Sequence, residues 1–171
     1  MIYEPAEDSF LLQKYVRKYA GGKVLDVGTG LGIQAITALE KTKDVLAVDI
    51  NPEAVKLLKE KGIKAKVSNL FSNVKGKFNL IIFNPPYLPE DKREPKDSAR
   101  ATTGGKKGYE LIEKFLKQAK SFLKKEGRIL MVCSSLTGDV EKLFKKYGYK
   151  SKKLEEEKYF FEKIYVYLLQ R

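Results

Sequence analysis

The chain has 171 residues, a length that fits one domain and is too short for two of full size. It contains no histidine and one cysteine, Cys133, which excludes an intrachain disulfide, a histidine-based catalytic triad and a metal centre built on histidine or cysteine. Lys and Arg outnumber Asp and Glu by 34 to 22, giving a net charge of +12. Such a charge fits a polyanionic partner or lysines that solvate helix surfaces.

No targeting segment is evident in the sequence. The first residues lack the basic start and apolar stretch of a secretory signal, and the apolar runs Leu80–Phe83 and Ile129–Cys133 are far shorter than a membrane span. We therefore expect a cytoplasmic protein with no membrane association. Abundant Lys and Glu with few Cys, Gln and Asn residues are also typical of a thermophile.

Helix-like and strand-like patterns alternate along the first half of the chain. A helix is expected over Glu7–Tyr19, with Phe10, Leu11, Tyr15 and Val16 on one face. The pattern then predicts a strand over Val24–Val27, a helix from about Gly32 to Lys41, a strand over Val45–Asp49, a helix capped by Asn51 and ended by Gly62, an edge strand over Lys64–Ser68, and a strand over Leu80–Phe83.

The second half continues the alternation and ends differently. A helix is expected over Tyr109–Lys125, a strand over Arg128–Ser134, a helix over Asp139–Tyr147, and two strands within Lys150–Leu169 around Glu155–Lys158. The prediction is a single α/β domain, residues 1–171, with a doubly wound, mostly parallel sheet and a C-terminal antiparallel hairpin. Ligands bind such sheets beyond the carboxyl ends of the strands, so the loops after Val27, Val48, Ser68 and Phe83 are the candidate site.

A glycine loop follows the first predicted strand. Gly28 and Gly30 allow a tight turn and let a ligand lie against the backbone. The spacing fits neither the dinucleotide fingerprint nor a P-loop, and Asp26 before the glycines would repel a pyrophosphate but can anchor a cationic amino group. Asp49, at the end of the second strand, is placed to accept hydrogen bonds from a ribose diol. A ribose and an ammonium without phosphate indicate S-adenosylmethionine.

The second motif is Asn84-Pro85-Pro86-Tyr87, after the fourth predicted strand. The oxygen of Asn84 and the carbonyl of Pro85 can accept the two hydrogens of a planar NH2 group, while Tyr87 stacks on its plane. With an activated methyl supplied by the cofactor, the protein has only to position a poor nucleophile and offset the charge that develops on nitrogen. No histidine is needed for that chemistry.

The Asn-Pro-Pro-Tyr motif resembles that of class I methyltransferases which modify planar nitrogen atoms. The opening segment Tyr3–Leu12 is similar to that of the HemK-related family, in its eukaryotic and archaeal branch. The resemblance implies methylation of the glutamine amide in the Gly-Gly-Gln motif of class I translation release factors. It also implies a small zinc-binding activator protein as a partner, for which the edge strand over Lys64–Ser68 is the expected docking site, and a cap over the site formed by residues 1–22.

Site residues carried over by motif fall into two groups. The resemblance implies cofactor contacts from Ser9, Asp26, Gly28, Gly30, Asp49, Asn69, Leu70 and Asn84. It implies that Asn84, Pro85, Pro86, Tyr87 and Leu88 hold the substrate amide, with Asn84, Pro85 and Tyr87 taking part in catalysis, and that no metal is involved. Ser9 stands where threonine is usual and Asn69 where aspartate is usual. The segment Thr102–Gly108 lies where relatives carry a glycine-bearing loop, and it departs from theirs in detail.

Other functions remain open at this point. The same pocket could methylate a flipped adenine or cytosine in DNA or RNA, which the net charge favours and the short chain disfavours. A protein lysine is a further candidate substrate, although an ammonium fits an amide pocket poorly. A catalytically idle nucleic-acid-binding module is disfavoured by Asp26, Asp49 and Asn84. For a release factor as substrate, the positive charge would steer the enzyme to an acidic patch on the factor or to factor held near ribosomal RNA.

Overall fold

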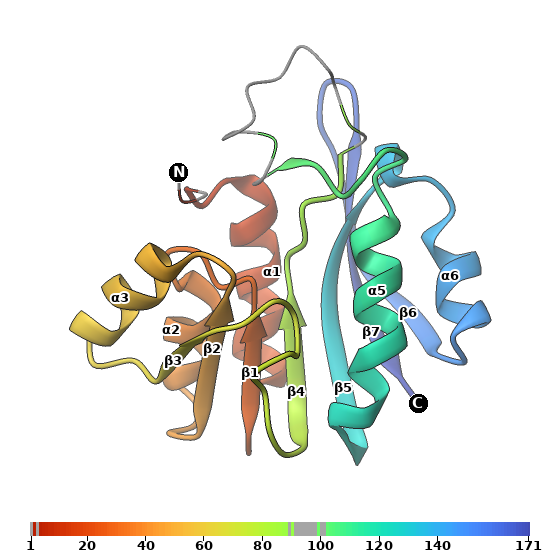
Figure 1. Cartoon of the computed structure of the whole chain (residues 1–171). Coiled ribbons are helices and arrows are strands. Elements are labelled where there is room, and N and C mark those ends of the chain that lie inside the picture. The colour runs from red at the N-terminus through yellow and green to blue at the C-terminus, as the bar shows by residue number, and fades with distance from the viewer. Residues whose placement is uncertain (1, 3, 89, 91–98, 100–101) are drawn as a thin grey trace.

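A computed structural model describes residues 2, 4–88, 90, 99 and 102–171; Tyr3 of the opening segment lies outside them. A seven-stranded sheet has the order β3-β2-β1-β4-β5-β7-β6 and separates two layers of helices (Figure 1). The pairs among β3, β2, β1, β4 and β5 are parallel, whereas β7 is antiparallel to β5 and to β6. The predicted α/β class with a C-terminal antiparallel hairpin is confirmed.

The bounds of most elements follow the sequence pattern. The strands are β1 (Val24–Val27), β2 (Val45–Asp49), β3 (Ala65–Val67), β4 (Phe78–Phe83), β5 (Leu123–Ser134), β6 (Lys150–Lys158) and β7 (Lys163–Gln170). The helices are α1 (Glu7–Tyr19), α2 (Ile33–Leu39), α3 (Pro52–Glu60), α5 (Glu110–Ala119) and α6 (Val140–Lys146), with short 3-10 turns η1 (Lys120–Phe122) and η2 (Ser135–Thr137). The expected cap of α3 is confirmed, since Asn51 accepts a hydrogen bond from the amide of Glu53 at 3.0 Å.

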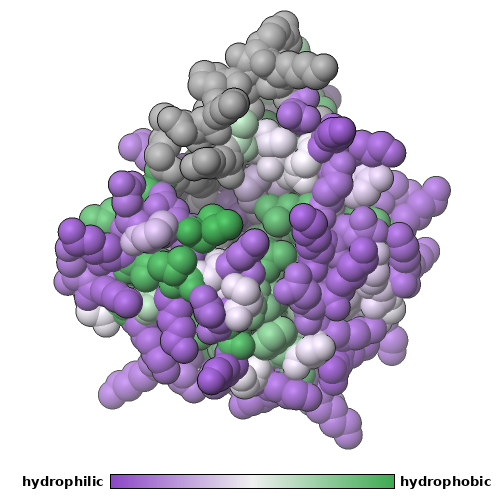
Figure 2. All heavy atoms as spheres, in the orientation of Figure 1, coloured by the Kyte–Doolittle hydropathy of each residue, from purple (hydrophilic) through white to green (hydrophobic). Residues whose placement is uncertain are grey.

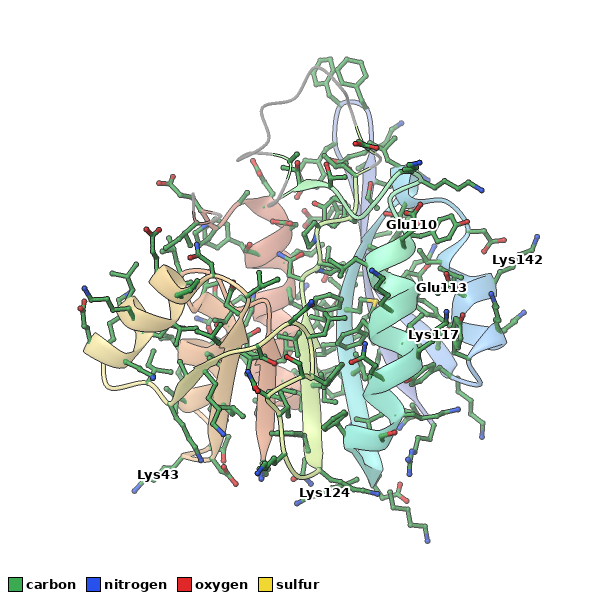
Figure 3. The ribbon with its side chains drawn as sticks, in the orientation of Figure 1. Lys43, Glu110, Glu113, Lys117, Lys124 and Lys142 are labelled. Carbon is green, nitrogen blue, oxygen red and sulfur yellow. The ribbon has the colours of Figure 1, made fainter. Side chains whose placement is uncertain are left out.

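Two hydrophobic clusters hold the helices against the sheet, one on each face. Alternate residues of the central strands point to opposite sides, so that Leu25 and Leu46 pack with α5 and α6, while Val24 and Val45 pack with α1, α2 and α3. The α5–α6 layer is further joined by Glu113, which accepts hydrogen bonds from the hydroxyl of Tyr147 at 2.6 Å and from the Lys146 ammonium at 2.9 Å (Figure 3). Because helices cover both faces of the sheet, a ligand can reach the central strands only beyond their ends.

Two predictions about helices are corrected. The helix expected over Tyr109–Lys125 ends at Ala119, and β5 already begins at Leu123, whose side chain is buried in the core and pairs in register with Phe78. Lys124 and Lys125 look helical by charge spacing but lie exposed on the start of this strand. On α1, Phe10 is 56% exposed although it was expected on the apolar face; Leu12 takes the buried position.

The turn of the C-terminal hairpin is also corrected. The sequence predicts two strands around Glu155–Lys158, but these residues belong to β6, and the chain turns after them at Tyr159–Glu162. The acidic run is accommodated in the strand because its neighbours carry the opposite charge: Glu156 accepts from Lys153 at 3.1 Å and from Lys163 at 2.7 Å. Residues that look like strand interior by composition therefore form the tip.

The surface accounts for much of the positive charge. Figure 2 shows hydrophilic residues over most of the visible face, with a smaller hydrophobic area toward its middle. Lys43 and Lys142 extend away from the body of the molecule (Figure 3), and the Lys142 side chain is 85% exposed, as expected of solvating lysines. Across the described ranges, no helix has the length and apolar content needed to cross a membrane.

Candidate functional site

One cavity of about 1090 Å³ opens at the carboxyl ends of the parallel strands. It is lined by the loops that follow β1, β2, β3 and β4, together with the start of α1. Every sequence-predicted site residue lies on its wall: Ser9, Asp26, Gly28, Gly30, Asp49, Asn69, Leu70, Asn84, Pro85, Pro86, Tyr87 and Leu88. The structure thus brings together residues that are up to 79 positions apart in the chain.

The glycine loop wraps around the carboxylate of Asp49. The backbone of Gly28 has φ 67° and that of Gly30 has φ 54°, in the left-handed region that residues other than glycine rarely occupy. This conformation directs the amide of Gly30 to one oxygen of Asp49 at 2.9 Å, while the other oxygen accepts from the amide of Asn51 at 2.8 Å. Asp49 is therefore fixed at the cavity wall, with lone pairs that remain available to a ligand diol.

Asp26 is almost completely buried beneath the same loop. One of its oxygens, Oδ2, accepts hydrogen bonds from the Thr29 hydroxyl at 2.6 Å and the Ala35 amide at 3.1 Å, which ties β1 to the start of α2. Burial, with a smaller contribution from the nearby charge of Asp49, raises the pKa of this carboxyl to about 7, although the two hydrogen bonds act to lower it. A buried carboxylate that ionises with difficulty, lining a cavity, is suited to receive a cationic group.

The loop after β3 contains a strained residue at the cavity wall. Leu70 has φ 50°, and it is the only residue other than glycine among the described residues with a positive φ. The turn is held by Ser68, whose hydroxyl donates to the Leu70 carbonyl at 2.8 Å and accepts from the amide of Asn73 at 3.0 Å. The preceding Asn69 is exposed beside the cavity. Strain held at a cavity wall is typical of a binding loop.

Asn84 is oriented by a carboxylate from α1. Its Nδ2 donates to Asp8 Oδ2 at 3.2 Å and to Ser9 Oγ at 3.4 Å, and the Tyr87 hydroxyl donates to the same Asp8 oxygen at 3.1 Å. The opposite end of the amide, Asn84 Oδ1, is buried and has no hydrogen-bond partner among the described residues. Since Asp8 can only accept, it selects the rotamer in which Asn84 presents its oxygen to a ligand.

The segment Thr102–Gly108 packs against the Asn-Pro-Pro-Tyr motif. The amide of Leu88 donates to the Thr102 carbonyl at 2.9 Å, and the amide of Gly104 donates back to the Leu88 carbonyl at 2.9 Å. A Cβ at position 104 would lie 2.6 Å from the carbonyl oxygen of Pro86, so only glycine permits this approach. The loop therefore supports the Asn-Pro-Pro-Tyr turn from outside, and Thr102 reaches the cavity.

The cavity is acidic, although the protein as a whole is basic. Its described lining carries five carboxylates and neither Lys nor Arg; the five are Asp8, Asp26, Asp49, Glu53 and Glu162. Such a wall attracts cations and repels phosphate groups. The lining therefore fits a ligand that brings its own positive charge.

Three of these acids, Asp8, Glu53 and Glu162, were not singled out from the sequence. Asp8 lies one helical turn before Leu11 and Leu12, so a carboxylate on the apolar face of the first helix was an available signal. Glu162 comes from the tip of the C-terminal hairpin and accepts from the Ser134 hydroxyl at 2.5 Å. Local sequence offers no signal for Glu162, because its place depends on where the hairpin turns.

The chain is similar to a protein family and to methyltransferases from several organisms. Residues 7–163 match the family model described as the methyltransferase small domain. A Methanocaldococcus jannaschii relative, assigned by its name to the protein N5-glutamine methyltransferases, is 44% identical over 153 residues, which cover 84% of this chain and 78% of the relative. Mouse methyltransferase HEMK2 is 30% identical over 77% of this chain and 71% of its own length. The release factor glutamine methyltransferase of Aquifex aeolicus is 37% identical, and the matched part spans 48% of it.

Solved structures give the same fold. A chain from the E. cuniculi Mtq2–Trm112 complex, described as responsible for methylation of the eRF1 termination factor, superimposes with a TM-score of 0.80 over 99% of this chain and 98% of that one, at 22% identity. A ribosomal protein L11 methylase from Lactobacillus delbrueckii gives 0.69 over 97% of this chain and 80% of that one, also at 22% identity.

Proposed function

The chain belongs to the methyltransferase small domain family, and on that premise we propose that it is an S-adenosylmethionine-dependent N-methyltransferase acting on the glutamine side-chain amide of the Gly-Gly-Gln motif in a class I release factor. The observation that carries this proposal is the buried, unpartnered Oδ1 of Asn84 in an otherwise satisfied group. A buried acceptor is costly unless a ligand donates to it. The NH2 group of a primary amide is such a donor.

The cavity residues fit S-adenosylmethionine. When bound, this cofactor supplies a methyl group activated by a sulfonium. Asp26 would hold the ammonium, since both of its hydrogen bonds within the described chain end on Oδ2 and Oδ1 remains for a ligand. Asp49 would accept from the ribose, and Ser9, Asn69 and Leu70 would complete the contacts around the glycine loop. The acidic lining also suits a cofactor that carries two positive charges.

In the transfer step the amide nitrogen gains the methyl group as the carbon–sulfur bond breaks and gives up one of its two protons, and this chain contributes by positioning the amide. Asn84 Oδ1 and the Pro85 carbonyl would accept the two amide hydrogens, which turns the nitrogen lone pair toward the methyl group and offsets the charge that develops on nitrogen. Tyr87 and Leu88 would fix the plane of the amide. Asp8 contributes indirectly, because it holds the Asn84 amide and the Tyr87 hydroxyl in one arrangement. Residues 1–22 would cap the site of this single domain, as Pro5, Asp8 and Ser9 on the cavity wall suggest.

A partner protein is part of the proposal. β3 lies at the edge of the sheet, with Lys66 and Val67 exposed, so a small zinc-binding activator could add a strand there. Acidic residues on the activator would face Lys64 and Lys66. Co-expression with such an activator should raise solubility and activity, and unchanged values would argue against the pairing.

The substrate is tested by competition among candidates. With labelled S-adenosylmethionine, a folded class I release factor should be labelled faster than a short Gly-Gly-Gln peptide, because one amide provides little binding energy. A factor with asparagine in place of the target glutamine should take no label. Transfer to the factor should slow as salt rises, mainly through substrate capture, if surface charge steers the encounter with the factor or with factor near ribosomal RNA. Label on DNA, RNA or a lysine instead would refute the glutamine assignment.

A further inference from the structure

The tip of the C-terminal hairpin, Tyr159–Glu162, exposes two phenylalanines. Phe160 is 97% and Phe161 is 89% exposed, more than any other large hydrophobic residue in the described chain. Their rings lie 5.5 Å apart, centroid to centroid, and form one apolar knob. Single exposed apolar residues are common on proteins, but two adjacent, fully exposed aromatic rings mark a contact surface.

The local backbone gives no reason for phenylalanine at these positions. The amide of Tyr159 donates to the carbonyl of Glu162 at 2.8 Å, which closes a two-residue turn. Two-residue hairpin turns favour Gly and Asn, because the commonest types need positive φ values. Neither Phe160 nor Phe161 has a positive φ, so the turn is of a less favoured kind. Phenylalanine is unfavourable here for two reasons: the turn prefers other residues, and the rings are exposed to solvent. Residues that are unfavourable for folding are often retained for function.

The tip is fixed in place beside the cavity. Lys14 on α1 pairs with Glu155 at 2.8 Å, and the Tyr15 hydroxyl donates to the Leu154 carbonyl at 3.2 Å, so β6 is fastened to the helix that carries Asp8. On the other strand, the Lys163 amide donates to the Ser135 hydroxyl at 2.9 Å.

The next residue after the phenylalanines reaches the cavity itself. Glu162 lies on the cavity wall, directly after Phe161 in the chain. Figure 1 shows the hairpin of β6 and β7 rising past the sheet at the end where the loop after β4 leaves it. A molecule that contacts the tip is therefore adjacent to the opening of the site.

We propose that Phe160 and Phe161 dock the folded protein substrate, by entering an apolar depression on its surface close to the target glutamine. This inference rests on the proposed function. The two rings can bury about 150–250 Å² each, well below the roughly 800 Å² per partner of a stable interface, so the tip serves a partner that is also held elsewhere. The cavity supplies that second point of contact through the glutamine amide. A second copy of this chain, bound through the tips alone, has no such point.

A nucleic acid is the other occupant that exposed aromatic rings could suit, through base stacking. The acidic cavity argues against it. Glu162 and Asp8 would face a phosphate backbone laid from the tip to the site, and the described lining has no Lys or Arg to neutralise it. The tip therefore favours a protein surface.

The test uses a variant that improves the turn while it removes the rings. Phe160→Asn with Phe161→Gly installs the favoured hairpin sequence, so thermal stability should be unchanged or higher. kcat/KM on the folded release factor should fall about tenfold or more, as when aromatic anchors are lost from an interface, while the Gly-Gly-Gln peptide and cofactor affinity change less than about twofold. Ile36→Gln with Leu39→Gln, which alters two exposed apolar residues of α2 outside the cavity, is the matched control and should leave all values unchanged.

Each other result overturns the docking role. If the wild type labels the factor and the tip variant labels it equally fast, the rings do not dock the substrate. An equal loss with peptide and factor would place the effect in the cavity instead. A wild-type dimer that the tip variant converts to a monomer identifies a second copy as the occupant. Wild-type labelling of RNA or DNA but not of the factor, reduced by the tip change, would refute the proposed function together with the docking role.

Discussion

Affinity for S-adenosylmethionine should depend on pH through Asp26. Burial raises the pKa of this carboxyl to about 7, yet only its ionised form attracts an ammonium. Between pH 5.5 and pH 7.5 the ionised fraction of such a group rises from about 3% to about three quarters. The dissociation constant should therefore fall about 25-fold over this range. The range stops at 7.5 because a ligand α-amino group with a pKa of about 8 is mostly uncharged at higher pH.

The assay is isothermal calorimetry with wild type and Asp26→Asn. Asparagine keeps an oxygen for the Thr29 hydroxyl and the Ala35 amide but cannot ionise, so its affinity should be weak and nearly independent of pH. Buffers with different protonation enthalpies should show that wild type releases a proton on binding at pH 6 and that the variant does not.

The folding stability of the cofactor-free protein should depend on pH in the opposite direction: the contribution of Asp26 falls as pH rises, whereas cofactor affinity increases. Because the folded pKa of Asp26 lies above its unfolded value, its stabilising contribution is complete below about pH 4 and is lost as pH rises through about 7. In thermal melts without cofactor, the melting temperature of Asp26→Asn relative to that of wild type should therefore rise between pH 5 and pH 8. A flat wild-type affinity profile, or the same slope in the variant, would refute an ionising Asp26 as the cation anchor.

Substitutions at four further positions separate effects on cofactor binding, methyl transfer and folding. Asn84→Ala and Asn84→Asp should each abolish methyl transfer while cofactor affinity stays within about threefold, since only substrate contacts in the transition state are lost; a matching loss of affinity would mean a structural role. Asp8→Asn should lower kcat by about tenfold or more with little change in cofactor affinity. The NH2 group of the new side chain can donate to Asn84 Oδ1, which would favour the flipped amide that no longer presents its oxygen to the substrate. Asp49→Ala should weaken cofactor binding by on the order of 1.5–3 kcal/mol, measured by calorimetry. Gly104→Ala should lower the melting temperature and the peptide kcat/KM together, since a Cβ would lie 2.2 Å from the Gly108 carbonyl oxygen.

The order of the elements and the place of the site could be predicted from the sequence. Val24–Val27 and Val45–Asp49 are short apolar runs that only a buried parallel strand explains, and Asn51 with Pro52 marks a helix start by local hydrogen bonding alone. Loops at the carboxyl ends of adjacent parallel strands must meet at one edge, so the cavity followed from the pattern.

Boundaries that depend on long-range pairing could not be predicted. Leu123 and the lysines after it fit a helix by spacing, but the pairing of Leu123 with Phe78 makes them a strand. Likewise, Glu155–Lys158 have the composition of a turn, but they pair with β7, and Glu156 is held by Lys163 across the strands and by Lys153 on its own strand. In both places strand pairing overrides the local preference of the residues, and the pairing could not be seen in the local sequence because the partner residue is distant in the chain.

The orientation of the Asn84 amide, the charge of the cavity wall and the surroundings of the cavity were decided only by the tertiary structure. The sequence shows Asn84 in its motif, but only the fold brings Asp8 from 76 positions away to fix which end of the amide faces the cavity. The same holds for the acidic lining, which the net charge of +12 conceals, and for the exposed rings of Phe160 and Phe161 beside Glu162. Chain-local physics determines which elements form; burial, charge and hydrogen-bond direction at the site arise from residues that become neighbours only when the sheet assembles.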